Sequence, residues 1–134
     1  RGFTAFTETA DPEEVMAVLA DYHAAMGRRI LEFEGTLERF TGDGIMVFFN
    51  DPVPLPDPAA RAVRMALAMQ REVARLAAGW KRRGYDLGMG VGIAQGFATI
   101  GGTHWSSSFM SASSSEYWYW LLLTMPPIRS AGWF

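Results

Sequence analysis

The sequence predicts one α+β domain, in which two helices cover one face of a mostly antiparallel sheet. Two long amphipathic segments, opened by the Asp-Pro pairs at Asp11 and Asp57, predict the helices. Short apolar runs bounded by glycines, between and after those segments, predict the strands. With 134 residues, the chain is long enough for one core but hardly for two.

The first helix is expected to begin at Asp11, which is placed to cap it. Pro12 suits the first helical position, and the following glutamates offer one placed for a capping box. Apolar residues then recur at helical spacing. Gly35 is expected just past the helix, as its C′ residue.

A hairpin is expected next, with strands at Thr36–Thr41 and Ile45–Phe49 and a Gly-Asp-Gly turn at 42–44. Five apolar residues in succession predict that the second strand is covered on both faces. Four prolines within residues 50–58 predict a loop. The second helix follows this loop and is expected to stop at Gly84.

The last third of the chain changes character. Leu87–Ile93 alternates aliphatic residues with glycines, which predicts a strand with one bare face. Gly96 is expected to turn the chain into a short strand at Phe97–Ile100. From about residue 102 the sequence becomes rich in Ser and then in aromatic residues and Leu.

The composition excludes several classes of function. Apolar residues make up 49% and charged residues 19% of the chain, which is typical of a globular protein. A net charge of -2 without a long basic run argues against a dedicated nucleic-acid binder. There is no Cys, and the two His are isolated, so thiolate sites are excluded and a His-based zinc site is not expected.

Membrane insertion is not expected for this chain either. Its longest apolar run, Tyr117–Met125, is far shorter than the roughly 20 residues that a membrane span needs. The chain begins with Arg rather than Met, so we expect it to be a fragment or an internal segment. A cytoplasmic location is expected.

Three sequence blocks, in this order, resemble the class III nucleotidyl cyclases, the adenylate/guanylate cyclase catalytic domain. The blocks are RGFTAFTE at 1–8, ERFTGDGIMVFF at 38–49 and GVGIAQGFATIG at 90–101. The resemblance implies a ferredoxin-like βαββαβ nucleotide cyclase fold whose first strand is missing, because it would precede Arg1. It covers residues 1–101 as a partial catalytic domain and leaves residues 102–134 as a divergent tail.

The resemblance also implies a site for ATP or GTP and for Mg²⁺ or Mn²⁺. In that family, the hairpin Asp (here Asp43) and a second Asp ahead of the Gly-Phe-Thr hold two metal ions, which activate the ribose 3′-hydroxyl while pyrophosphate leaves. Gly2, Phe3 and Thr4 match the loop whose backbone amides face the phosphates, and Gly42 adjoins the metal ligand. The turn taken alone is better explained as an ordinary Asp-Gly hairpin turn, and the flanking blocks are what favour a metal ligand.

Other positions depart from the family pattern. The first metal Asp would lie ahead of Arg1, and nothing after Gly101 matches the Asn and Arg that stabilise the transition state. Arg39 stands where adenylate cyclases carry a purine-selecting Lys, so it is a candidate substrate contact and equally a solvated strand residue. No catalytic residue is therefore assigned, and we expect this chain alone to be weakly active or inactive. The resemblance implies a homodimer.

Alternative functions stay open. A non-catalytic dimerisation or nucleotide-sensing module would share this fold. A ferredoxin-like RNA-binding domain is disfavoured by the glycine-bearing strand and the acidic balance, and a diguanylate cyclase by the lack of a Gly-Gly-Asp/Glu-Glu-Phe block. Because the strand ahead of Arg1 would be central in the sheet, one hypothesis is that Tyr117–Thr124 takes its place.

Overall fold

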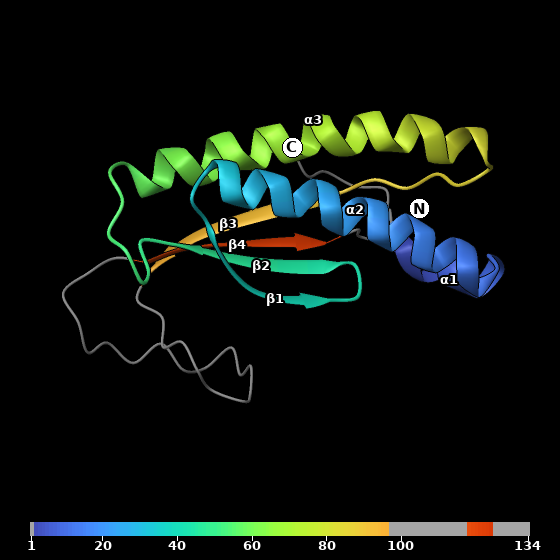
Figure 1. The fold of residues 1–134 in the computed structure, drawn as a ribbon, viewed down its shortest axis with the longest axis horizontal. Coiled ribbons are helices and arrows are strands. Elements are labelled where there is room, and N and C mark those ends of the chain that lie inside the picture. Colours follow the sequence, from blue (N-terminus) through green and yellow to red (C-terminus); the bar gives the residue numbers. More distant parts are fainter. Residues whose placement is uncertain (1, 97–117, 125–134) are drawn as a thin grey trace.

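The computed structural model describes residues 2–96 and 118–124 of the chain. In these two stretches the chain forms an α+β sandwich, with helices α2 and α3 on one face of a four-stranded antiparallel sheet (Figure 1). The predicted fold class is therefore confirmed. In chain order the elements are α1 (Phe3–Thr9), α2 (Pro12–Glu32), β1 (Thr36–Thr41), β2 (Gly44–Phe49), α3 (Pro58–Arg82), β3 (Gly90–Gly96) and β4 (Trp118–Thr124).

Helix α2 begins where predicted, but its first turn is not capped in the predicted way. Asp11 occupies the N-cap position without a side-chain capping hydrogen bond. Glu14, three residues on, accepts a hydrogen bond from the Tyr85 hydroxyl and lies 3.2 Å from Arg83. The capping-box prediction was wrong because partners about 70 residues away, just after α3, hold this carboxylate, and local spacing does not reveal them.

The end of α2 also differs in detail from the prediction. Phe33 is the C-cap, and the left-handed residue is Glu34, with φ of 60°. Gly35 has a different role, because a Cβ built on it would lie 2.7 Å from Cγ1 of Val47. Glycine is therefore needed here for the close approach of β2, and its assignment as the C′ residue was wrong by one position.

The β1–β2 hairpin is confirmed. Thr41 pairs with Gly44, so Gly42 and Asp43 are the two residues of the turn. Gly42 has φ of 60°, the left-handed value that such turns require and that glycine adopts without a steric penalty. β2 is buried at five of its six positions, as its apolar run predicts.

The second helix is confirmed as well. α3 begins after the predicted proline-rich loop and stops before Gly84, whose φ of 92° marks a left-handed helix end. Asp57 is its N-cap residue, in a left-handed conformation and without a side-chain capping bond. None of the helices in the described part of the chain has the length and apolarity needed to cross a membrane.

The strand order is β1-β2-β4-β3, so β4 lies between β2 and β3 and is antiparallel to both. Leu121, for example, pairs with Val47 on one side and with Ile93 on the other. The hypothesis that this segment takes the central place in the sheet is thereby confirmed. β3 begins three residues later than predicted, because Leu87 enters the core before strand pairing begins. The expected strand at Phe97–Ile100 lies outside the described residues.

The core lies between the two long helices and the sheet. Each large apolar side chain buried there contributes roughly 1.5–3 kcal/mol. Helix α1 joins the core through Phe6, whose ring lies 4.6 Å from that of Tyr85, centroid to centroid. The largest fully buried side chains are those of Val18, Tyr22, Met26, Ile45, Val47, Phe49, Met65 and Met69.

Candidate functional site

The candidate site is the turn of the β1–β2 hairpin. β1 is an edge strand, so this turn lies at the border of the sheet. Gly42 is exposed and Asp43 is half-buried. The turn points toward the end of the molecule where helix α1 lies (Figure 1). The sequence therefore placed Asp43 correctly in the turn, and its role as a metal ligand stays a prediction.

Helix α2 contacts this turn through His23. Its Nε2 donates a hydrogen bond of 2.8 Å to the carbonyl oxygen of Gly42. The imidazole also packs on Phe40 of β1, with 4.3 Å between the ring centroids and 39° between the ring planes. His23 is half-buried on α2, and the sequence gave no sign of this contact between residues 19 apart.

The neighbouring residue on α2, Tyr22, lies under the same region. Its side chain is fully buried, and its hydroxyl has no hydrogen-bond partner among the described residues. Burial, and after it the negative charge of Asp43, raises the pKa of Tyr22 well above its usual value. The phenol therefore stays protonated, and the carboxylate of Asp43 is close enough to act on it electrostatically.

The N-terminal residues do not form the expected loop. Gly2 is the N-cap of α1, and Phe3 and Thr4 lie in its first turn. The prediction of a loop was wrong because the backbone closes helical hydrogen bonds here: the N–H of Phe6 donates to the carbonyl oxygen of Gly2 at 3.3 Å, and that of Ala10 to Phe6 at 2.9 Å. The assignment of Gly2, Phe3 and Thr4 as phosphate contacts stays a prediction.

Arg39 lies on β1 and is already paired. Both guanidinium contacts go to the carboxylate of Glu38, and this hydrogen bonding raises the pKa of Arg39 above its usual value. A β-bulge between Leu37 and Arg39 allows these two neighbours to meet, and the Arg39 side chain is 52% exposed. A role in binding substrate, which stays a prediction, would require Arg39 to exchange Glu38 for a base or a phosphate.

Asp43 fits one ligand of a divalent-metal site rather than a complete site. Within residues 2–96 and 118–124, no group of three or more His, Cys, Asp or Glu side chains is placed to hold a metal ion. Mg²⁺ is nevertheless commonly held by one or two carboxylates, with substrate phosphates and waters as the other ligands. Asp43 can therefore supply one oxygen to a metal ion that arrives with a nucleotide.

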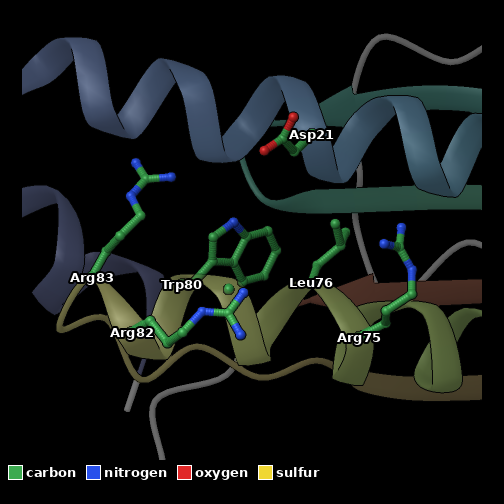
Figure 2. Close-up of a pocket in the computed structure, with 7 residues that line it drawn as sticks. Asp21, Arg75, Leu76, Trp80, Arg82 and Arg83 are labelled. Atoms are coloured by element: carbon green, nitrogen blue, oxygen red, sulfur yellow. The ribbon is translucent and has the colours of Figure 1, made fainter.

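A pocket of about 400 Å³ opens between α2 and α3 (Figure 2). Asp21 and three arginines are among the residues that line it. Two of these arginines already have partners, Arg75 with Glu72 at 2.7 Å and Arg83 with Glu14 at 3.2 Å. The pocket thus offers little uncompensated positive charge for an anionic nucleotide, and we assign the candidate site to the hairpin turn.

The fold and the turn together define a class of protein. Two helices lie on one face of an antiparallel sheet, and the turn of its edge hairpin carries a half-buried carboxylate, which agrees with the ferredoxin-like cyclase fold that the three sequence blocks imply. A family model described as the adenylate and guanylate cyclase catalytic domain matches residues 1–108. The chain therefore belongs to the adenylate and guanylate cyclase catalytic domain family.

Individual relatives agree with this membership. Adenylate cyclase 1 of Rhizobium meliloti (strain 1021) is 30% identical over 100 residues, which are 74% of this chain and 15% of that protein. The adenylate cyclase of Anabaena cylindrica is 41% identical over 51 residues, which are 38% of this chain and 10% of that protein. The chain thus spans only a small part of these curated relatives.

Solved structures show the same fold. The guanylyl cyclase Cya2 superposes with a TM-score of 0.58 and 38% identity, over 63% of this chain and 43% of that one. The adenylyl cyclase CyaB from P. aeruginosa gives a TM-score of 0.60 and 34% identity, over 63% of this chain and 44% of that one.

Proposed function

We propose that this chain is part of a class III nucleotidyl cyclase that converts ATP or GTP into a 3′,5′-cyclic nucleotide and pyrophosphate in cyclic-nucleotide signalling. The observation that carries the proposal is the position of Asp43, in the turn of the edge hairpin where the resemblance implies a metal ligand. The names of the relatives support the reaction type but not one base, since they include both adenylyl and guanylyl cyclases.

In this proposal the protein mainly positions the substrate. Asp43 holds one divalent cation, and Gly42 supplies the left-handed backbone that turns the carboxylate toward it. Arg39, the N-cap residue Gly2 and the first residues of α1, Phe3 and Thr4, contact the nucleotide. The 3′-oxygen bonds to the α-phosphorus, the bond to pyrophosphate breaks, and the hydroxyl proton passes to solvent. When bound, Mg²⁺ or Mn²⁺ supplies charge that favours the 3′-alkoxide and stabilises the departing pyrophosphate.

We further propose that this chain alone is weakly active or inactive. Asp43 is the metal-binding Asp of the family pattern that the described residues match, whereas the pattern implies two. Losing one electrostatic group of this kind typically costs about 10²–10³ in rate. The resemblance also supports a homodimer in the cytoplasm as the active form. Residues 1–101 would be the partial catalytic domain and residues 102–134 the divergent tail.

The test compares Asp43→Asn with Asp86→Asn, a matched control at an exposed aspartate in the segment after α3. Calorimetry measures the affinity of each variant for Mn²⁺·ATP and Mn²⁺·GTP, and mass spectrometry detects any cyclic product. We expect Asp43→Asn to weaken metal–nucleotide binding at least about tenfold, because even an outer-shell partner of a metal contributes 10–100-fold. The control should bind as the unmodified chain does.

Two other outcomes are informative. Equal Mn²⁺·nucleotide affinity in Asp43→Asn and the unmodified chain would overturn the assignment of Asp43. Nucleotide binding that is independent of the metal and of Asp43, with no cyclic product, would instead support the nucleotide-sensing module of the same fold.

A further inference from the structure

We propose that His23 is a positioning residue that fixes the orientation of Asp43, by holding the peptide group that leads into it. This inference rests on the proposed function of Asp43 as a metal ligand. None of the three sequence blocks that carry the cyclase resemblance contains His23.

The turn needs such a restraint because of its place in the sheet. Among the described strands, β1 pairs with β2 alone, and its last three residues are exposed. A bulge between Leu37 and Arg39 interrupts the hydrogen-bonded pairing of β1 with β2, just before the residues of β1 that lead into the turn. Between the bulge and the turn, β1 is held by its pairing with β2 at Arg39, Phe40 and Thr41. A metal ligand at the tip of this two-stranded ribbon is therefore held more firmly when a further element supports it.

The contact from α2 acts on the right group. The carbonyl of Gly42 and the N–H of Asp43 belong to one planar peptide unit. A hydrogen bond of 2.8 Å from His23 to that carbonyl therefore fixes the plane from which the Asp43 side chain departs. Because the carbonyl can only accept, Nε2 must carry a proton, which it does both in one neutral tautomer and in the charged imidazole. His23 therefore acts by holding the Gly42 carbonyl in place, and this role does not require a charge on the imidazole.

The anchor on the helix side is rigid. His23 lies in the middle of a 21-residue helix, and its neighbour Tyr22 is fully buried in the core. The imidazole also packs against the ring of Phe40, and this contact links α2 to β1 just before the turn. The rings of His23 and the buried Tyr22 lie 5.6 Å apart, centroid to centroid, so the contact to the turn starts from a part of α2 that is fixed in the core. Helix and turn thus form one unit around residues 22, 23 and 40–43.

The test uses two substitutions in the full chain. His23→Phe keeps an aromatic ring against Phe40 but removes the donor, and His23→Gln keeps an N–H donor at a similar reach. Hydrogen exchange measures protection of the amides of residues 40–44, and calorimetry measures Mn²⁺·ATP affinity. We expect about fivefold faster exchange and about fivefold weaker binding in His23→Phe, matching one hydrogen bond of typical net strength, and recovery of most of both in His23→Gln.

The outcomes separate this inference from the proposed function. Unchanged protection of the turn in His23→Phe would overturn the positioning role. Faster exchange with unchanged Mn²⁺·ATP affinity would reduce the contact to a structural one, provided that Asp43→Asn still weakens binding. If Asp43→Asn leaves the affinity unchanged, the proposed function fails, while the exchange data still decide whether His23 holds the turn. In the Asp43→Asn background, His23→Phe should add no further loss of affinity.

Discussion

Gly35→Ala tests how tightly the hairpin is attached to helix α2. The new Cβ would lie 2.7 Å from Cγ1 of Val47 and 3.4 Å from side-chain atoms of Ile30 and Phe49. Val47 cannot easily move away, since it is fully buried and its β-branched side chain has few alternative rotamers. The backbone must shift instead, and overpacking of this kind costs typically about 1–3 kcal/mol of the free energy of unfolding.

Gly27→Ala is the matched control for this substitution. Gly27 lies within α2. Apart from its chain neighbours and the backbone of its own helix, no atom lies within 4 Å of a Cβ built on it. Replacing a helical glycine by alanine should therefore raise stability, by up to about 1 kcal/mol. Urea unfolding followed by circular dichroism measures the free energy of unfolding of both variants. The urea midpoints can be compared directly if the dependence of that free energy on urea is the same in both.

The two substitutions should thus change stability in opposite directions. Adding Val47→Ala removes the atom that clashes, so the double variant should lose less than the sum of the two single losses. If Gly35→Ala proved as stable as the unmodified chain, the close packing of residue 35 against β2 would be refuted.

Two further predictions concern the sheet and the pH dependence of stability. Leu121→Pro removes an N–H from the strand between β2 and β3 and should cost about 1–3 kcal/mol, because a backbone carbonyl loses its partner; an unchanged urea midpoint would contradict the position of β4. The Tyr85 hydrogen bond, and then Arg83, hold the pKa of Glu14 below its ordinary 4.5. This stabilisation is complete above pH 4.5 and is lost as the pH falls through the lowered pKa, so Tyr85→Phe should flatten the acid limb of stability against pH. If the stability of Tyr85→Phe and that of the unmodified chain fell equally steeply at acid pH, the contribution of this hydrogen bond would be refuted.

Local signals in the sequence were sufficient for most of the fold. The Asp-Pro pairs and the helical spacing of apolar residues predicted α2 and α3, because both depend on interactions within a few residues. The Gly-Asp-Gly at 42–44 predicted the hairpin, since a left-handed turn residue is itself a local requirement. The start of α3 and its stop before Gly84 followed from the same kind of signal.

The errors have a common physical cause, which is competition from distant partners. Glu14 has the spacing of a capping-box residue but bonds Tyr85, which is 71 residues away. Gly35 has the spacing of a helix stop but is needed for its contact with Val47. The contact of His23 with Gly42 was missed for the same reason, since helical periodicity gives the face of a residue and not its partner. Asp43 could be placed from the sequence, whereas its support from α2 could not.

Strand β4 also supports the candidate site. β4 pairs with β2 along Ile45–Phe49, and β2 leads directly from the turn that carries Asp43. Without a strand in this position, the inner edges of β2 and β3 would leave backbone N–H and C=O groups unpaired next to the core, which is costly when such groups are buried. β2 would then lose the partner that holds it against α2 and α3. The position of Asp43 thus depends on two supports, His23 from the helix layer at the tip of the hairpin and β4 from the sheet at its base.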